Sequence, residues 1–206
     1  MSRIPNTAFE VKNSNIRNND IQTIAGYFGS FSDDVFTGDI CPAGFVVESA
    51  GQTPCEGYES YGIYNSNTHY FITAADGSVD GYTGDHTGLF CFDSYGVNEM
   101  TDIHGNVYRA GANTLGLELP ADVRGDFVEL IVGERYKWGA GNFSTLPDEN
   151  KGFAVLTNGR WVAQAAAPTD GSVYLKIEKD LTPGFEAGTR YRFDGYVGRV
   201  LRSTAA

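Results

Sequence analysis

The clearest hydrophobic pattern in the chain lies at residues 126–138, DFVELIVGERYKW. Phe127, Glu129 and Ile131 alternate with valines and a leucine that point to the opposite side, and the stretch is rich in β-branched and aromatic residues. Alternation with a period of two is typical of a strand in a sheet. The pattern therefore predicts one long strand over this range.

Turn signals border several further strands. Asn158–Gly159 lies between two strand-like stretches within residues 152–166, and this dipeptide suits a hairpin turn whose two central residues need positive φ. Asp170–Gly171 precedes an alternating strand at 172–178, which places Val173, Leu175 and Ile177 on one face. We expect a hairpin at the first dipeptide and a turn followed by a strand at the second.

The rest of the body has the same character. Further short apolar segments are separated by Gly, Asn, Asp and Pro, with a hairpin expected around His104–Gly105, and the predicted strands lie at 45–48, 61–64, 68–74, 89–92 and 191–200. Many short strands at turn spacings of roughly 8–12 residues are typical of a β-sandwich or barrel. We predict an all-β fold, an antiparallel sandwich or barrel of short strands over residues 26–206. One continuous body is favoured, and two subdomains that divide near 110–114 are the alternative.

Residues 1–25 do not share this pattern. Asparagines interrupt every period, and the apolar residues are spaced widely without a local partner. A frayed terminus, or one or two helical turns within 14–25, would both suit such a segment. The functional alternative is an extended N-terminal arm that docks on a neighbouring subunit, with contact residues Arg3, Phe9, Val11, Lys12, Ile16 and Arg17.

Charge is distributed unevenly along the 206 residues. The formal net charge is −11, and residues 1–108 contain three basic and 14 acidic groups, whereas residues 109–206 contain 12 of each. No Lys or Arg occurs between positions 18 and 108. Nucleic acids and anionic membranes select for basic surfaces, so neither is an expected partner of the first half. No apolar run reaches a membrane span or resembles a secretory signal, and we expect synthesis in a cytoplasm.

Candidate chemistry is sparse. Cys41, Cys55 and Cys91 form no CxxC pair, so buried free thiols are expected, although Cys41 and Cys55 could bridge in an oxidising medium. No GxSxG motif occurs, and the three histidines lie in no recognisable triad context. The acidic, Gly-rich stretch 76–85 offers oxygen ligands for Ca²⁺ without EF-hand spacing, and solvated turns are the simpler interpretation. No cofactor, metal or catalytic residue is assigned.

Four stretches together resemble the decoration or auxiliary proteins of tailed-bacteriophage heads. They are the Asn-rich arm RIPNTAFEVKNSNIRNND, the opening FTGDICPAGFVV, the block NTLGLELPADVRGDFVELIVGERYKWGAGNFS and the small-residue end of the chain. The resemblance implies a non-enzymatic virion structural protein on the capsid exterior, made in the bacterial cytoplasm. Its partners would be the major capsid protein and further copies of itself, as a dimer or trimer, bound multivalently.

The charge distribution then predicts an orientation, with the arm and the neutral half toward the partner and the acidic half toward solvent. Two alternatives stay open. Aromatic residues among Asn and Asp between Tyr58 and Tyr95 would suit a carbohydrate-binding or adhesion module that recognises a host-surface glycan. A hydrolase acting on glycans would instead need paired carboxylates, and no pair stands out.

Overall fold

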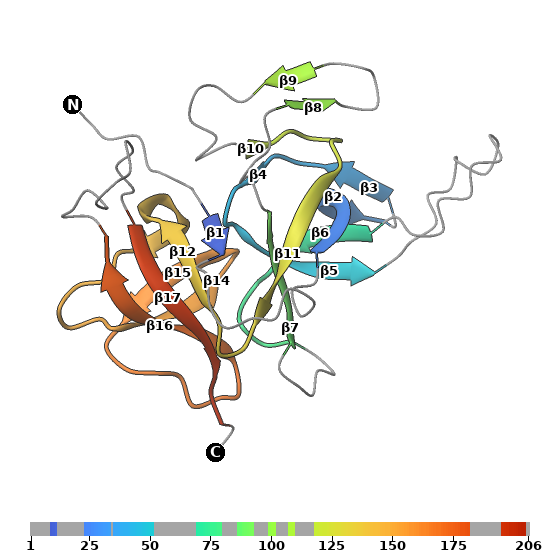
Figure 1. Cartoon of the computed structure of the whole chain (residues 1–206). Coiled ribbons are helices and arrows are strands. Elements are labelled where there is room, and N and C mark those ends of the chain that lie inside the picture. The colour runs from blue at the N-terminus through green and yellow to red at the C-terminus, as the bar shows by residue number, and fades with distance from the viewer. Residues whose placement is uncertain are drawn as a thin grey trace.

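The chain folds into β-strands, which confirms the all-β prediction (Figure 1). The computed structural model describes residues 9–11, 23–33, 35–51, 69–79, 86–92, 99–101, 107–109, 118–181 and 195–204. These residues contain no α-helix and one short 3-10 helix, Ala140–Asn142. The predicted strand at 61–64 and the loop of the predicted hairpin around His104 lie outside the described residues.

The first sheet closes into a barrel. Its strands are β2 (Thr23–Ser32), β3 (Val35–Gly38), β5 (Val46–Gly51), β6 (His69–Thr73), β7 (His86–Phe92) and β11 (Gly125–Ile131). The order is β11-β7-β5-β6-β2-β3, and β11 also pairs with β2, which completes a ring of five strands. β3 continues from the far end of β2 as an outer strand. Most pairs are antiparallel as expected, but β2 and β6 run parallel.

The second sheet forms a half-barrel. Its strands are β1 (Phe9–Val11), β12 (Arg135–Gly139), β13 (Phe143–Thr145), β14 (Phe153–Thr157), β15 (Arg160–Gln164), β16 (Val173–Asp180) and β17 (Gly195–Arg202). The order is β1-β12-β17-β16-β14-β15-β13, with β13 parallel to β15. Two small pairs complete the fold, β4 (Cys41–Pro42) with β10 (Glu118–Leu119), and β8 (Glu99–Thr101) with β9 (Val107–Arg109).

The prediction of one long strand at 126–138 is wrong, because the chain turns at Gly133. Gly133 adopts a φ of +93°, and the Glu134 amide donates to the Ile131 carbonyl oxygen at 3.1 Å. β11 ends before this turn in the barrel, and β12 starts after it in the half-barrel. The alternation breaks at this turn, because three apolar residues, Leu130–Val132, are followed by the three polar or small residues Gly133–Arg135. The chain therefore passes from the barrel to the half-barrel at residues 132–134. Residues 110–114, the alternative boundary between two subdomains, lie outside the described residues.

The Asn158–Gly159 hairpin is confirmed. Both residues have positive φ, +47° and +74°, and they join β14 to β15. The tip of this hairpin also contacts the barrel, since the Val46 amide donates to the Gly159 carbonyl oxygen at 2.8 Å. The turn at Asp170–Gly171 is confirmed as well, with Gly171 at a φ of +87° just before β16.

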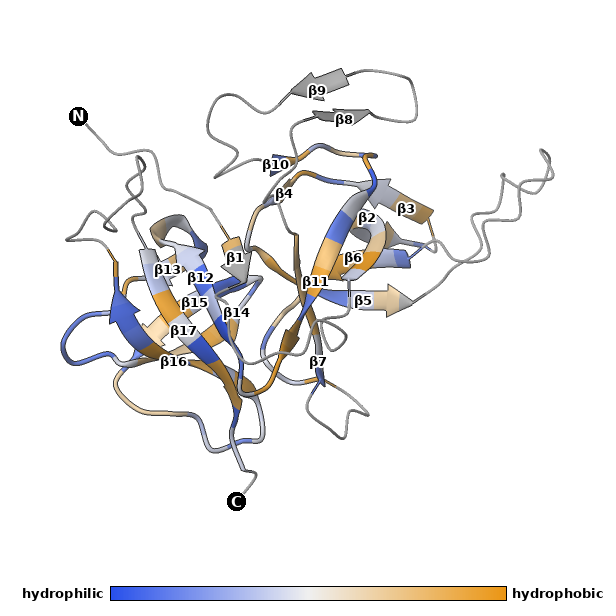
Figure 2. Ribbon diagram, viewed as in Figure 1, coloured by the Kyte–Doolittle hydropathy of each residue, from blue (hydrophilic) through white to orange (hydrophobic). Residues whose placement is uncertain are grey.

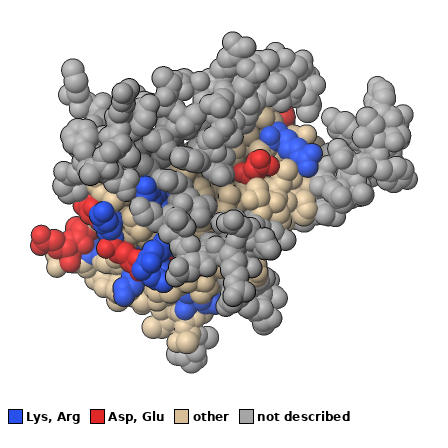
Figure 3. Space-filling view, in the orientation of Figure 1, with Lys and Arg blue, Asp and Glu red and all other residues tan. Residues whose placement is uncertain are grey.

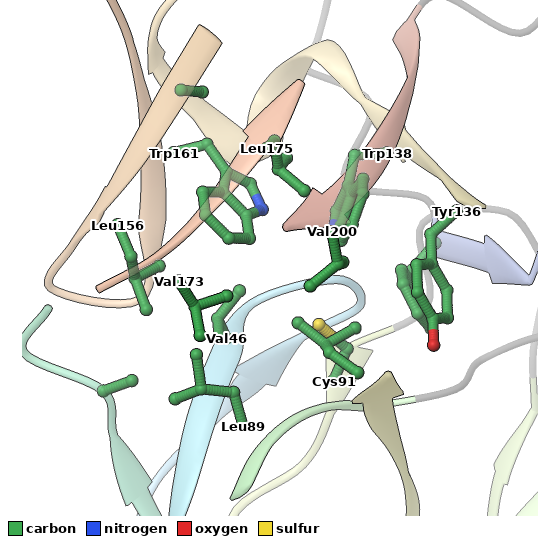
Figure 4. Packing of buried hydrophobic residues seen from close by; sticks show 14 of the residues in the cluster. Val46, Leu89, Cys91, Tyr136, Trp138, Leu156, Trp161, Val173, Leu175 and Val200 are labelled. Atoms are coloured by element: carbon green, nitrogen blue, oxygen red, sulfur yellow. The ribbon is translucent and has the colours of Figure 1, made fainter. Parts of the chain in front are cut away.

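Two apolar clusters hold the fold together. One lies within the barrel and is dominated by aromatic rings, among them Phe71 and Phe127, which stack at 4.2 Å between centroids. The other joins the two sheets (Figure 4), because Val46, Leu89 and Cys91 of the barrel pack in the same cluster as Trp138 and Trp161 of the half-barrel. The hydropathy view shows apolar strand positions where the sheets face each other (Figure 2). The barrel and the half-barrel therefore share one core.

Candidate docking surfaces

The N-terminal strand is anchored in the chain's own core. β1 pairs antiparallel with β12, and Phe9 lies opposite Trp138. The Phe9 side chain is fully buried and stacks on Tyr136, with 5.6 Å between ring centroids and an 18° interplanar angle. In this fold the Phe9 ring therefore packs in the core of its own chain, and the docking role expected for Phe9 stays a prediction.

Of the other arm residues expected to make contacts, the structure describes only the backbone of Val11. The backbone of Val11 pairs with Tyr136, which continues the β1–β12 ladder. Arg3, Lys12, Ile16 and Arg17 lie outside the described residues. Sequence reasoning placed the apolar residues of the arm against a partner because residues 1–25 contain no apolar face of their own. The edge of β12 that pairs with Phe9–Val11 lies more than a hundred residues away in the chain.

The outer face of the half-barrel carries an unexpected row of apolar side chains. Val155 lies opposite Val162 on one side and Tyr174 on the other, and Tyr174 lies opposite Leu201. All four are half-buried, while their neighbours along each strand (Leu156, Trp161, Leu175 and Val200) are buried in the core. Strands of an antiparallel sheet with one solvated face usually alternate apolar and polar residues. We call Val162, Val155, Tyr174 and Leu201 the apolar row.

A second row of outward side chains is basic. Arg135 of β12 lies opposite Arg199 of β17, and Arg199 lies opposite Lys176 of β16. Like charges directly opposite each other on neighbouring strands are unfavourable. We call Arg135, Arg199 and Lys176 the basic row, and it runs beside the apolar row across β17 and β16. In the face shown in Figure 3, most of the visible Lys and Arg side chains gather over the half-barrel.

One carboxylate partly neutralises the basic row. A register shift in β16 between Ile177 and Lys179 leaves Glu178 as an extra residue. Its two carboxylate oxygens accept hydrogen bonds from Arg135 Nε at 2.5 Å and Arg199 Nε at 2.7 Å. Partial burial opposes ionisation of Glu178, but the two guanidinium groups outweigh it and lower the pKa. Arg199 Nη1 also donates to the Gly133 carbonyl oxygen at 3.0 Å.

A different surface lies at the outer end of the barrel, around β3. Val35 and Ile40 are 64% and 51% exposed, the highest values among the large hydrophobic side chains that the structure describes. Exposed carboxylates lie among them: Asp33 in the β2–β3 turn, Asp39 beside Ile40, and Asp122, whose Oδ1 would lie 2.2 Å from a Cβ added to Gly38. We call Asp33, Val35, Asp39, Ile40 and Asp122 the β3 edge. Arg124, which is exposed, is the basic residue nearest to Asp122 in the chain.

Glu129 is a buried carboxylate that sequence reasoning did not single out. Its Oε2 lies 2.8 Å from Nδ1 of His86, and Oε1 accepts a hydrogen bond from the Gly88 amide at 3.3 Å. The side chain of Glu129 is 4% exposed, whereas that of His86 is 43% exposed. The pair sits at the irregularity in the β11–β7 ladder, where Gly88 has a φ of +69°. The Glu129 carboxylate therefore provides a hydrogen-bond partner for the Gly88 amide and for the His86 ring at a point where the ladder is interrupted.

The stretch considered for calcium is only partly described. Asp76 Oδ1 accepts a hydrogen bond from the Ser78 amide at 2.7 Å, so this carboxylate stabilises its own turn. Asp80 and Asp85 lie outside the described residues. Within the part of the chain that the structure describes, no group of three His, Cys, Asp or Glu side chains could hold a metal ion.

Two of the three cysteines are described; both are buried thiols, as expected, and neither forms a disulfide. Cys41 and Cys91 are fully buried, and burial raises the pKa of the Cys41 thiol well above its usual value. Cys55 lies outside the described residues.

Comparison of the chain with known proteins finds no relative. Among the described residues, no helix is long and apolar enough to cross a membrane. No family model matches the chain, and no match was found among curated proteins or solved structures.

Proposed function

We propose that this chain is a non-enzymatic structural protein of a tailed-bacteriophage virion, which decorates or cements the exterior of the capsid. Its partners are the major capsid protein and further copies of itself. Two features support this function: the resemblance of the sequence to phage-head decoration proteins, and the apolar row on the outer face of the half-barrel. The docking surface lies on the neutral half of the chain, in agreement with the orientation expected from charge.

The observation that carries the proposal is the apolar row. Four half-buried apolar side chains from four adjacent strands form a continuous strip on the outer side of a sheet whose inner side is already the core. Interfaces combine an apolar centre with a polar rim. The basic row supplies one side of such a rim, because Lys176 on β16 and Arg199 on β17 border the strip.

Repetition explains how such a small surface suffices. A capsid presents many identical sites, so an assembly of several copies gains affinity without new contacts at each site. Strands are rigid supports for a docking strip, since every apolar residue of the row is paired with a neighbouring strand, and Val155 and Tyr174 are paired on both sides. The surface is therefore set before binding and costs little ordering entropy.

Carbohydrate binding is the second candidate, and one observation favours it. Phe153 and Tyr174 are half-buried on the outer face with 6.1 Å between ring centroids. Aromatic rings at a surface offer flat apolar faces on which a sugar ring can stack. A glycan array with wild-type protein and Tyr174→Ala tests this candidate, which predicts specific binding that the variant loses.

Co-sedimentation with phage heads that lack the protein tests the main proposal. Val155→Lys places a charge in the centre of the apolar row, and we expect it to reduce binding at least roughly tenfold, as desolvating one charge requires. Thr157→Lys is the matched control, because Thr157 lies on the same strand and outer face but is exposed and outside the row. Equal binding of wild type and Val155→Lys, or no binding of wild type, would overturn the proposal.

A further inference from the structure

We propose that the outer face of the half-barrel binds the β3 edge of a second copy of the chain, so that copies join head to tail. This inference rests on the docking role proposed for the outer face and names one partner for it. The two surfaces lie on different halves of the protein, one on the half-barrel and one at the outer end of the barrel.

The two surfaces are complementary in hydrophobicity. The apolar row offers a strip of half-buried side chains, and the β3 edge offers Val35 and Ile40, which project more than half of their surface into solvent. Protruding apolar side chains fit best against a continuous apolar strip, where both lose contact with water. Burial of apolar surface contributes about 25 cal/mol per Å² to such a contact.

The two surfaces are also complementary in charge. The basic row has three cationic side chains and only Glu178 as an internal counter-charge, and Lys176 makes no ion pair within the described residues. The β3 edge has three exposed carboxylates; Asp33 and Asp39 lie in the part of the sequence that contains no Lys or Arg, positions 18 to 108, whereas Asp122 has the exposed Arg124 two positions away in the chain. Complementary potentials of this kind steer association and select its register.

The edge position of β3 adds a further reason. β3 pairs with β2 on one side. Exposed edge strands with apolar side chains promote association unless they are covered or carry charges that prevent it. The aspartates of the β3 edge prevent pairing between two copies of that edge, because like charges would meet, but they favour contact with a basic surface.

Because each copy would use two different patches, the contact is heterologous. Such contacts either close into rings or extend into open chains. Both arrangements suit a protein that links neighbouring positions of a lattice. The signature of a heterologous contact is that two variants, each defective in a different patch, can still bind each other once.

Analytical ultracentrifugation of the purified protein tests the inference without capsids. We expect wild type to self-associate at about 0.1 mM, more strongly at roughly 50 mM than at 500 mM salt, because screening weakens charge pairs. Val155→Lys removes the outer-face patch, and Val35→Lys with Ile40→Lys removes the β3 edge. Each variant alone should be a monomer, and an equimolar mixture should form one-to-one dimers that do not grow further. Thr157→Lys should associate like wild type, and circular dichroism confirms that every variant is folded.

Two results would overturn the inference: a wild type that stays monomeric at low salt, or a mixture of the two variants that forms no dimer. These results are distinguishable from failure of the proposed function. Particle binding that is lost in Val155→Lys while wild type stays monomeric would support the capsid role and exclude the head-to-tail contact. Self-association without particle binding would exclude the capsid role and support the contact.

Discussion

Gly159 lies directly against the ring of Phe45: a Cβ atom added to Gly159 would be 2.3 Å from Cζ of that ring. The contact joins the tip of the β14–β15 hairpin to the segment that leads into β5 of the barrel. Val46 donates its amide to the Gly159 carbonyl oxygen in the same place. The hairpin turn is thus also a junction between the two sheets.

This junction predicts that Gly159→Ala costs more stability than substitution at another glycine with positive φ. Gly133→Ala is the matched control, since Gly133 has a φ of +93° but nothing within 4 Å of an added Cβ. The control should lose about 1–2 kcal/mol from backbone strain alone. Gly159→Ala should lose a further 1–3 kcal/mol, roughly the cost of overpacking. Urea unfolding measures both, and equal losses would contradict the packing described at Phe45.

The buried position of Phe9 predicts that the N-terminal strand stabilises the fold. Phe9→Ala removes a fully buried ring from the cluster between the sheets, and we expect a loss of about 3–5 kcal/mol in the free energy of unfolding. Leu146→Ala, at a side chain that is 49% exposed, should change it by less than roughly 0.5 kcal/mol. Equal unfolding midpoints for Phe9→Ala and wild type would show that β1 does not occupy the β12 edge in solution.

Glu178 predicts a stability that depends on acid pH. Its pKa in the folded state lies below the ordinary value of a glutamate, so its ionised form stabilises the fold at neutral pH. This contribution is complete above the unfolded pKa and disappears as pH falls through the folded pKa. Because the three side chains are partly exposed, it amounts to about 0.5–1 kcal/mol.

Unfolding of Glu178→Gln between pH 7 and pH 3 measures this contribution. The variant should be less stable than wild type at pH 7, and the two stabilities should converge at the acid end. A constant difference across the range would exclude the ion pairs with Arg135 and Arg199 as its origin.

The cysteines predict a reactivity pattern. Cys41 and Cys91 are buried away from thiol reagents, and burial also raises the pKa of the Cys41 thiol, which disfavours its reactive thiolate. At most one thiol per native chain, that of Cys55, should therefore react rapidly, and all three should react after denaturation in non-reducing buffer. Finding one thiol per denatured chain would reveal a disulfide and contradict the free cysteines.

Local signals in the sequence predict the strands and turns well. Asn158–Gly159 and Asp170–Gly171 need positive φ in the places where the structure has it, and the alternation of Val173 and Leu175 marks the buried face of β16. These features depend on neighbours in the chain. The same reasoning makes 126–138 a single strand, because the stretch is rich in β-branched and aromatic residues on both sides of Gly133; the turn is marked only by this glycine and by the break in alternation at Gly133–Arg135.

The candidate surfaces depend on pairing between distant strands, which no local pattern contains. Val155, Tyr174 and Leu201 become one row only through the register of three strands. The partner of Phe9 is a sheet edge at Trp138, and the partner of Glu129 is His86, 43 residues earlier. Charge is the exception, since the contrast between the acidic first half and the neutral second half is visible in the sequence itself.

Thiol labelling on assembled particles tests the central claim, the docking role of the outer face, most directly. Val162→Cys places a reactive group in the apolar row, and Asp126→Cys places one at an exposed position on β11 of the barrel. The account predicts that particle binding slows maleimide reaction at position 162 at least roughly tenfold and leaves position 126 unchanged, because a buried interface excludes solvent. Equal reaction rates at position 162 in free and particle-bound protein would contradict the claim.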